Sequence, residues 1–223
     1  KRKAGWHNYK FKKRSWKPNE YANWLSKNIP NNDVDYFNYW KKNKPKYFFD
    51  SKDIDEYSIQ IKNILSDAEL SKIIENANLI KTGTFQYFSS QKYNIGFPPN
   101  WTLNPITENF IKPDLHWNQI PIFSDKTGDI KFIWEIGRFT FIYDLVRAYW
   151  ISGDTSYAET FWKIMDDWYI NNPPNNGPHW KCGQEISLRL MAICFGLYAF
   201  EDTTSTTPKR FTRLIGSIAA QAE

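Results

Sequence analysis

The final hundred residues alternate between helix-like apolar patterns and short polar breaks. Apolar residues recur every three or four positions, as one face of a helix requires, in residues 129–152, 155–172, 183–200 and 208–223. The breaks carry Asp, Gly and Pro, which start or stop helices. The pattern predicts four helices joined by short loops, the first of them long and capped by Asp129.

The middle of the chain has a different pattern. Residues 52–80 place Ile61, Ile64 and Leu65 at helical spacing, which predicts one or two amphipathic helices. Residues 81–110 combine turn residues with alternating aromatics, and residues 116–129 continue in the same way. Such composition is typical of loops with short extended pieces.

The first 50 residues are irregular and basic. They carry 13 Lys or Arg against 4 Asp or Glu, whereas the remaining residues carry 16 basic and 20 acidic side chains. Short helices are expected at residues 24–29 and 34–43. The uneven charge indicates either contact with an anionic partner or a solvated extension, and the sequence leaves both open.

Helices joined by short loops predict an all-α fold, arranged as a bundle or as a toroid of antiparallel helical hairpins. We divide the chain into a basic, aromatic-rich segment at residues 1–50 and a helical domain at residues 51–223. The sequence does not begin with Met, and its last helix reaches residue 223 without a stop signal. We therefore expect the natural protein to be longer.

Several classes of function find no support in the sequence. It shows no apolar run of 18 residues, no signal peptide, no phosphate loop, no dinucleotide fingerprint and no zinc spacing. We therefore expect no membrane span, cofactor or metal. Aromatic residues make up 18% of the chain, with 11 Trp. Their faces serve cores, but they also stack on sugar rings and bases.

The segment "GDIKFIWEIGRF" contains the first candidate site. Trp134, Glu135 and Arg138 lie three or four positions apart and project near one face of a helix. Together they would present a cation and a flat ring to a sugar acid. The alternative is a salt bridge within the helix beside a core Trp.

The segment "NNPPNNGPHWKCGQEISLRL" contains the second. Its loop delivers His179 and Trp180 to the start of a helix, whose free amides and partial positive charge suit a carboxylate or sulfate. Glu185 and Arg189 follow, one helical turn apart. The alternative is that His179 caps the helix, Trp180 packs, and Glu185 and Arg189 form a solvated pair.

In order and spacing, residues 97–200 resemble the N-terminal domain of the heparinase II/III-like polysaccharide lyases. The matching positions are Asp129, Lys131, Trp134, Glu135 and Arg138; Ala148 and Tyr149; Gly153, Asp154, Tyr157 and Ala158; Trp168; Asn172 and Pro173; and Gly177, Trp180, Glu185 and Arg189. The chain departs at His179, where the family usually has Asn. Histidine still donates a hydrogen bond to a carboxylate, but its charge would depend on pH.

The resemblance implies an incomplete (α/α) toroid, usually followed by a β-sandwich domain, in a periplasmic or secreted enzyme. It implies β-elimination at a uronic acid of an acidic polysaccharide. No recognised nucleic-acid fold motif is present, so we expect no nucleic acid as partner. The elimination reaction needs a group to neutralise the carboxylate, a base and an acid. The family's Asn-Asn-His segment is missing, because Gly177 follows Asn175 and Asn176. Catalytic residues are therefore expected beyond residue 223, and this segment alone is expected to be inactive.

The substrate-binding residues that the resemblance implies would form or support a groove wall. They are Trp134, Glu135, Arg138, His179, Trp180, Glu185 and Arg189. Two other functions remain open. A toroidal glycoside hydrolase would need Glu135 and Glu185 as its acid and base, although a nearby Arg argues against either being the acid. A non-catalytic domain would bind an anionic polymer or glycan through its basic arm.

Overall fold

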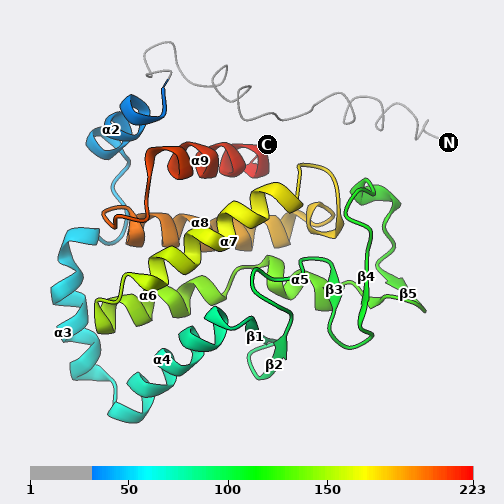
Figure 1. Cartoon of the computed structure of the whole chain (residues 1–223), viewed down its shortest axis with the longest axis horizontal. Coiled ribbons are helices and arrows are strands. Elements are labelled where there is room, and N and C mark those ends of the chain that lie inside the picture. The colour runs from blue at the N-terminus through cyan, green and yellow to red at the C-terminus, as the bar shows by residue number, and fades with distance from the viewer. Residues whose placement is uncertain (1–31, 223) are drawn as a thin grey trace.

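The computed structural model describes residues 32–222, which form eight α-helices and three small hairpins (Figure 1). The helices are α2 (Asp33–Asn43), α3 (Ile54–Ile64), α4 (Asp67–Lys81), α5 (Lys131–Gly137), α6 (Phe141–Ser152), α7 (Ser156–Asn171), α8 (Gly183–Phe200) and α9 (Pro208–Ala222). The strands are β1 (Thr84–Tyr87), β2 (Gln91–Asn94), β3 (Leu103–Asn104), β4 (Asn109–Phe110), β5 (Phe123–Ser124) and β6 (Gly128–Asp129). Short 3-10 turns cover Ser51–Asp53, Trp117–Gln119 and Pro178–Trp180.

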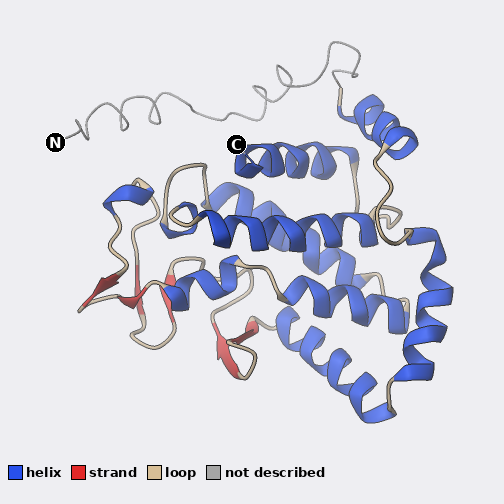
Figure 2. Cartoon of the chain, turned by 180° about the vertical axis from the view of Figure 1, so that it is seen from behind, coloured by secondary structure: helices blue, strands red, loops and turns tan. Residues whose placement is uncertain are grey.

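Helix α6 lies at the centre of the helical body. It packs against α3, α4, α7 and α8, while α9 packs on α7 and α8. Ile142, Leu145 and Val146 of α6 are completely buried. The strands pair only as three antiparallel hairpins, which lie on one side of the helical body near α5 (Figure 2). The prediction of an all-α fold is therefore confirmed.

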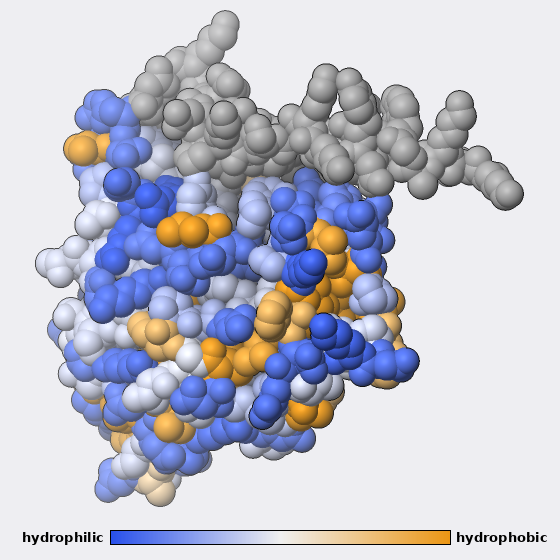
Figure 3. Space-filling view, turned by 45° about the vertical axis from the view of Figure 1, so that its right-hand side comes forward, coloured by the Kyte–Doolittle hydropathy of each residue, from blue (hydrophilic) through white to orange (hydrophobic). Residues whose placement is uncertain are grey.

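The hairpin region exposes several large apolar side chains. Ile106, Phe110, Ile122 and Phe123 are each more than half exposed. Figure 3 turns this end of the molecule toward the viewer and shows apolar side chains gathered on an otherwise mostly hydrophilic face. Separately, no helix within residues 32–222 is both long enough and apolar enough to cross a bilayer.

Most helices follow the apolar pattern of the sequence. The 52–80 segment forms two helices, α3 and α4, and the helix predicted at 183–200 is α8. Helix α7 buries Tyr157, Phe161, Ile164, Met165 and Trp168 on one face, as their spacing requires. These predictions are confirmed because each pattern has the period of a single straight helix.

The prediction of one long helix at residues 129–152 is wrong. The chain breaks it into α5 and α6, and Phe139 between them adopts a φ of 60°. The Phe139 ring is completely buried between Trp101 and Trp168, with centroids 5.5 and 4.9 Å away. Burying this ring outweighs the cost of a left-handed residue, and periodicity along the chain cannot reveal such a contact.

The described part of residues 1–50 joins the helical body. Helix α2 coincides with the helix expected at 34–43, and it buries Tyr36 and Phe37 against Phe211 of α9. A boundary at residue 50 therefore does not separate α2 from the body on which it packs. The helix expected at 24–29 and most of the basic residues lie outside the described residues.

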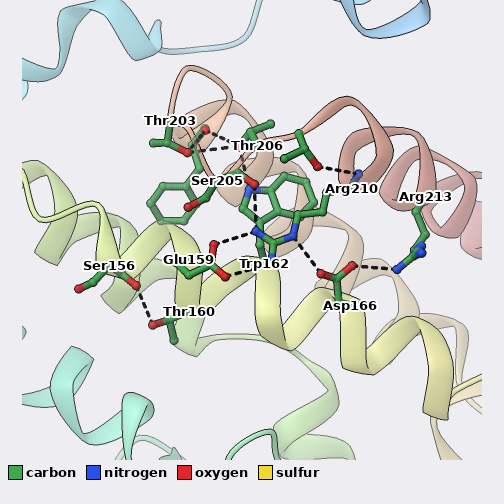
Figure 4. A network of polar contacts seen from close by, with 12 residues as sticks. Ser156, Glu159, Thr160, Trp162, Asp166, Thr203, Ser205, Thr206, Arg210 and Arg213 are labelled. Atoms are coloured by element: carbon green, nitrogen blue, oxygen red, sulfur yellow. Dashed lines mark hydrogen bonds and ion pairs between the residues drawn. The ribbon is translucent and has the colours of Figure 1, made fainter. Parts of the chain in front are cut away.

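A network of ion pairs fastens α9 to α7 (Figure 4). Arg210 makes two hydrogen bonds to Glu159, at 2.8 and 3.0 Å, and a third to Asp166 at 2.9 Å. Arg213 reaches the other oxygen of Asp166 at 3.0 Å. Because the guanidinium of Arg210 is only partly exposed and meets Glu159 with two parallel bonds, the network fixes the position of α9 as well as adding stability.

Close packing of α8 on α6 and α7 depends on Gly196. A Cβ atom there would lie 2.7 Å from Phe161 and 2.8 Å from Ile142, both buried. We expect Gly196→Ala to lower the free energy of unfolding by about 1–3 kcal/mol through overpacking. Gly183→Ala, at the exposed start of α8 with nothing within 4 Å, is the matched control. Equal denaturation midpoints for the two variants would contradict this account.

Candidate functional site

A cleft of about 520 Å³ opens between α4, the β1–β2 hairpin, α5 and α6. Its lining is mostly polar and includes three basic groups, Lys92, Arg138 and Arg147. Glu135 and Asp144 are the acidic residues that line it. Such a polar, open cleft suits a hydrophilic ligand better than an apolar one.

The guanidinium of Arg138 holds two buried carboxylates. Its Nε and Nη2 donate to Glu185 at 2.6 and 2.9 Å, and its Nη1 contacts Glu135. Glu135 and Glu185 are only 7% and 5% exposed, so they depend on Arg138 for opposite charge. Since Glu185 lies on α8, this three-residue cluster joins α8 to the junction between α5 and α6.

Glu135 also fixes the hairpin that forms the opposite side of the cleft. Its second carboxylate oxygen accepts a hydrogen bond from the backbone amide of Phe88 at 3.0 Å. Phe88 and Ser89 form the hairpin turn with φ values of 47° and 65°, an arrangement uncommon for residues other than glycine. The Phe88 ring meets Phe132 edge-on, with centroids 5.0 Å apart.

Arg189 lies beneath this cluster and is completely buried. It donates to the side chain of Gln221 and to the carbonyl oxygens of Gly137 and His179, the last two at 3.1 Å. Its guanidinium carbon lies 4.7 Å from the centre of the Trp168 ring. Burial lowers the pKa of Arg189 to about 9, and the charge of Glu185 opposes that shift. The side chain therefore stays cationic at neutral pH.

His179 is buried behind the cleft and is 1% exposed. Its Nε2 lies 2.7 Å from the carbonyl oxygen of Trp101, and because a carbonyl only accepts, Nε2 carries the proton. Its Nδ1 faces Gly137, where a Cβ atom would lie only 2.2 Å away. Burial first and the charge of Arg189 second lower the pKa of His179 to about 3, although the Trp101 hydrogen bond opposes this.

The structure divides the seven residues expected to bind substrate into two groups. Glu135 and Arg138 line the cleft. The other five stand behind it: His179, Glu185, Arg189 and Trp134 are buried, and Trp180 is half-buried. Trp134 donates to the carbonyl of Pro178 at 2.9 Å, which ties α5 to the loop before α8. These five residues support the wall that carries the cleft.

Two details of the sequence interpretation are wrong. Glu185 and Arg189 do not form a solvated pair, because Glu185 binds Arg138 and both side chains are buried. His179 does not change its charge near neutral pH, because desolvation keeps it uncharged. Trp101, whose carbonyl accepts from His179, is itself buried at 3% exposure and donates to Asp167 at 2.6 Å.

Several residues of the cleft belong to none of the sequence motifs described above. Lys92 comes from β2, and Asp144 and Arg147 form an ion pair at 2.6 Å on α6. Burial raises the pKa of Asp144, against the opposing effect of Arg147. The spacing of Asp144 and Arg147 was the available signal, but it indicated only a pair on a polar helix face. Among residues 32–222, no three His, Cys, Asp or Glu side chains are grouped to hold a metal ion.

The chain belongs to the heparinase II/III family of polysaccharide lyases, as its N-terminal part. The family model described as Heparinase II/III N-terminus matches residues 13–223. This confirms the resemblance inferred from the ordered motifs. No curated protein matches the chain.

Two solved structures share the fold, both of heparan sulfate lyase HepC from Pedobacter heparinus. The mutant form aligns with a TM-score of 0.56 and 17% identity, and another HepC structure with 0.54 and 18%. Each alignment covers 85% of this chain but 26% of the HepC chain. The chain thus spans about a quarter of the length of these relatives, and the helices described above correspond to the first part of a helical toroid.

Removing the guanidinium of Arg138 tests whether the cluster supports the cleft. We expect Arg138→Met to lower the free energy of unfolding by about 3 kcal/mol, because it leaves buried Glu135 without a counter-charge and leaves Glu185 with only the electrostatic attraction of Arg189. Arg147→Ala breaks an ion pair whose Arg is 48% exposed, and it should cost less than about 1 kcal/mol. Denaturant unfolding of the two variants makes the comparison, and similar losses would refute the structural role of Arg138.

Acid sensitivity tests the buried, neutral state of His179. The folded-state pKa of about 3 lies below the ordinary value of 6.5, so the unfolded chain binds a proton that the folded chain does not. Stability from this group is complete above pH 6.5 and falls by up to about 1.4 kcal/mol per pH unit as the pH drops toward 3.

The variant His179→Asn should remove this part of the pH dependence while keeping the slope due to carboxylates. Free energies of unfolding from neutral pH to about pH 4, measured for both proteins, give the two slopes. If the free energy of unfolding has the same slope against pH in both proteins, His179 is not the source of this acid sensitivity.

Proposed function

We propose that this chain is the N-terminal toroid portion of an enzyme that cleaves a uronic-acid-containing polysaccharide by β-elimination. The observation that supports the proposal is the cleft, in which Lys92, Arg138 and Arg147 meet on a polar surface. Membership of the lyase family supports the reaction class. The HepC structures carry the name heparan sulfate lyase, which makes an acidic glycan the natural first substrate class to test.

The charges of the cleft favour an anionic ligand. Three basic side chains against two acidic ones give the lining a net positive charge at neutral pH. Arg138 is held between carboxylates, whereas Arg147 is about half exposed at the surface. Lys92 reaches Asn76 at 3.0 Å and stands near Glu75. We propose that Lys92 and Arg147 contact carboxylate or sulfate groups, while Arg138 shapes the wall.

The proton-transfer residues of the reaction are proposed to lie outside this chain. The buried state of His179 supports this, because a neutral imidazole 1% exposed cannot meet a sugar. The cleft would then bind and orient the glycan while another part of the protein supplies base and acid.

The geometry gives no support to the glycoside hydrolase alternative. A hydrolase needs its two carboxyl groups on opposite sides of the scissile bond. Here Glu135 and Glu185 bind the same guanidinium, and Glu185 does not line the cleft. The other alternative, a non-catalytic domain that binds a polymer through its basic arm, depends on residues 1–50, most of which lie outside the described residues.

Incubation of the full-length protein with uronate polysaccharides tests the reaction. We expect ultraviolet absorbance to rise as unsaturated uronate ends form. Cleavage to products that lack a double bond would show hydrolysis and contradict the lyase proposal. Failure to cleave any uronate polysaccharide would also contradict it.

Binding by the 223-residue chain tests the cleft separately. We expect Lys92→Ala and Arg147→Ala each to weaken binding of an acidic oligosaccharide by up to about fivefold, with less effect at high salt. Lys163→Ala, exposed on α7 and outside the cleft, is the charge-matched control. Titration calorimetry measures all three, and an equal effect from the control would exclude the cleft as the binding site.

A further inference from the structure

A second pocket has a volume of about 410 Å³ and is lined by other segments of the chain than the cleft. It forms where residues 44–50 join α2 to the Ser51–Asp53 turn and pass the end of α8. Its aromatic lining consists of Tyr47, Phe48, Phe49, Tyr57 and Tyr198. It shares no residue with the cleft between α4 and α6, so the two can be tested independently.

The segment that forms this pocket is fastened at both ends to the C-terminal end of α8. At one end, Lys44 pairs with Glu201, and the hydroxyl of Tyr198 donates to the carbonyl of Pro45 at 3.1 Å. At the other end, the Ser51 hydroxyl lies 2.7 Å from a carboxylate oxygen of Glu201 and 2.7 Å from one of Asp202, and it donates its single proton to one of them. The aromatic residues between these anchors are therefore held in place before any ligand arrives.

The rings form a continuous wall. Tyr47 lies parallel to Tyr198, with centroids 4.3 Å apart and planes 13° apart. Phe48 lies 4.4 Å from Tyr47 and stacks at 6.0 Å on Phe195 of α8. Phe49 is inserted edge-on toward Trp150 at 5.2 Å and so anchors the run in the core.

Phe48 stands out because it is 76% exposed in a concave, anchored setting. Leaving a Phe side chain in water forgoes about 1.5–3 kcal/mol of burial. Its neighbours on either side pack inward, so the fold holds this ring outward without needing it for the core. An exposed ring at the mouth of a preformed pocket is a surface for stacking a ligand.

The polar groups of the pocket indicate which ligand. The lining includes two basic residues, Lys44 and Lys46, and two acidic residues, Asp50 and Asp53, so its formal charges cancel. The Tyr57 hydroxyl lies 3.5 Å from Asp53 and accepts a hydrogen bond from the amide of Asp50 at 3.2 Å. Carboxylates and ammonium groups at a rim pair with the hydroxyls of a sugar, while two carboxylates oppose a polyanion.

We propose that this pocket binds a neutral pyranose unit, with the apolar C–H face of the sugar on Phe48 and its hydroxyls toward Asp50, Asp53 and Lys46. The aromatic face carries partial negative charge and attracts the polarised C–H groups of a sugar. The pocket volume is sufficient for one or two sugar units. The site is distinct from the proposed acidic-glycan cleft, and its ligand class differs because its charge differs.

Ligand-observed NMR and titration calorimetry on the 223-residue chain test this proposal, with cellobiose and diacetylchitobiose as neutral probes and a sulfated uronate disaccharide as the charged probe. We expect at least one neutral probe to bind, and Phe48→Ala to weaken it about tenfold. Phe48→Trp, which keeps an aromatic face, should retain binding. Ile64→Ala, 79% exposed on α3, is the control for loss of an exposed apolar side chain and should have no effect.

Specific outcomes overturn the proposal. It fails if neither neutral probe binds, if Phe48→Ala changes affinity less than twofold, or if only the charged probe depends on Phe48. It also fails if sedimentation shows that Phe48→Ala abolishes self-association, since the ring would then serve a protein contact. Arg147→Ala should leave neutral-sugar binding unchanged, so failure of the acidic-glycan cleft and failure of this pocket remain distinguishable.

Discussion

The arrangement of the cleft depends on one guanidinium shared between two buried carboxylates. Arg138 binds Glu185 from α8 and Glu135 from α5, and Glu135 in turn holds the turn of the β1–β2 hairpin. Three segments far apart in the sequence are thereby fixed around one cation. Removing charge from water is costly, so such a cluster is stable only when every partner is present. The cluster therefore joins α5, α8 and the β1–β2 hairpin at one point of the cleft wall.

A second layer of polar groups lies beneath this cluster and serves the backbone. Arg189 donates to the carbonyls of Gly137 and His179, and so joins the end of α5 to the loop before α8. His179 fits against Gly137 so closely that only a residue without a side chain leaves room. The histidine that this chain has at position 179 is thus accommodated by local packing and by a neutral tautomer. Its role here is support of the backbone at the back of the wall.

The two pockets show how charge balance separates possible ligands. The cleft has a lining with a net positive charge. The pocket around Phe48 has balanced charges and an exposed aromatic ring. Under the two proposals, a glycan that contains both charged and uncharged units would contact this domain at two points. Binding at two points raises affinity without any new contact at either.

The sequence by itself determined most of the helices, their order and the family. The apolar period of α7, α8 and α9 is local information, because each residue's face follows from its position along one helix. The residues that matched the family motif did so by spacing alone. Only the tertiary structure decided which of these motif residues line the cleft. The break at Phe139, the pairing of Arg138 with Glu185, and the entry of Lys92 from a hairpin all depend on contacts between distant segments. Burial and desolvation, which set the charge of His179 and the exposure of Phe48, arise only when those segments pack together.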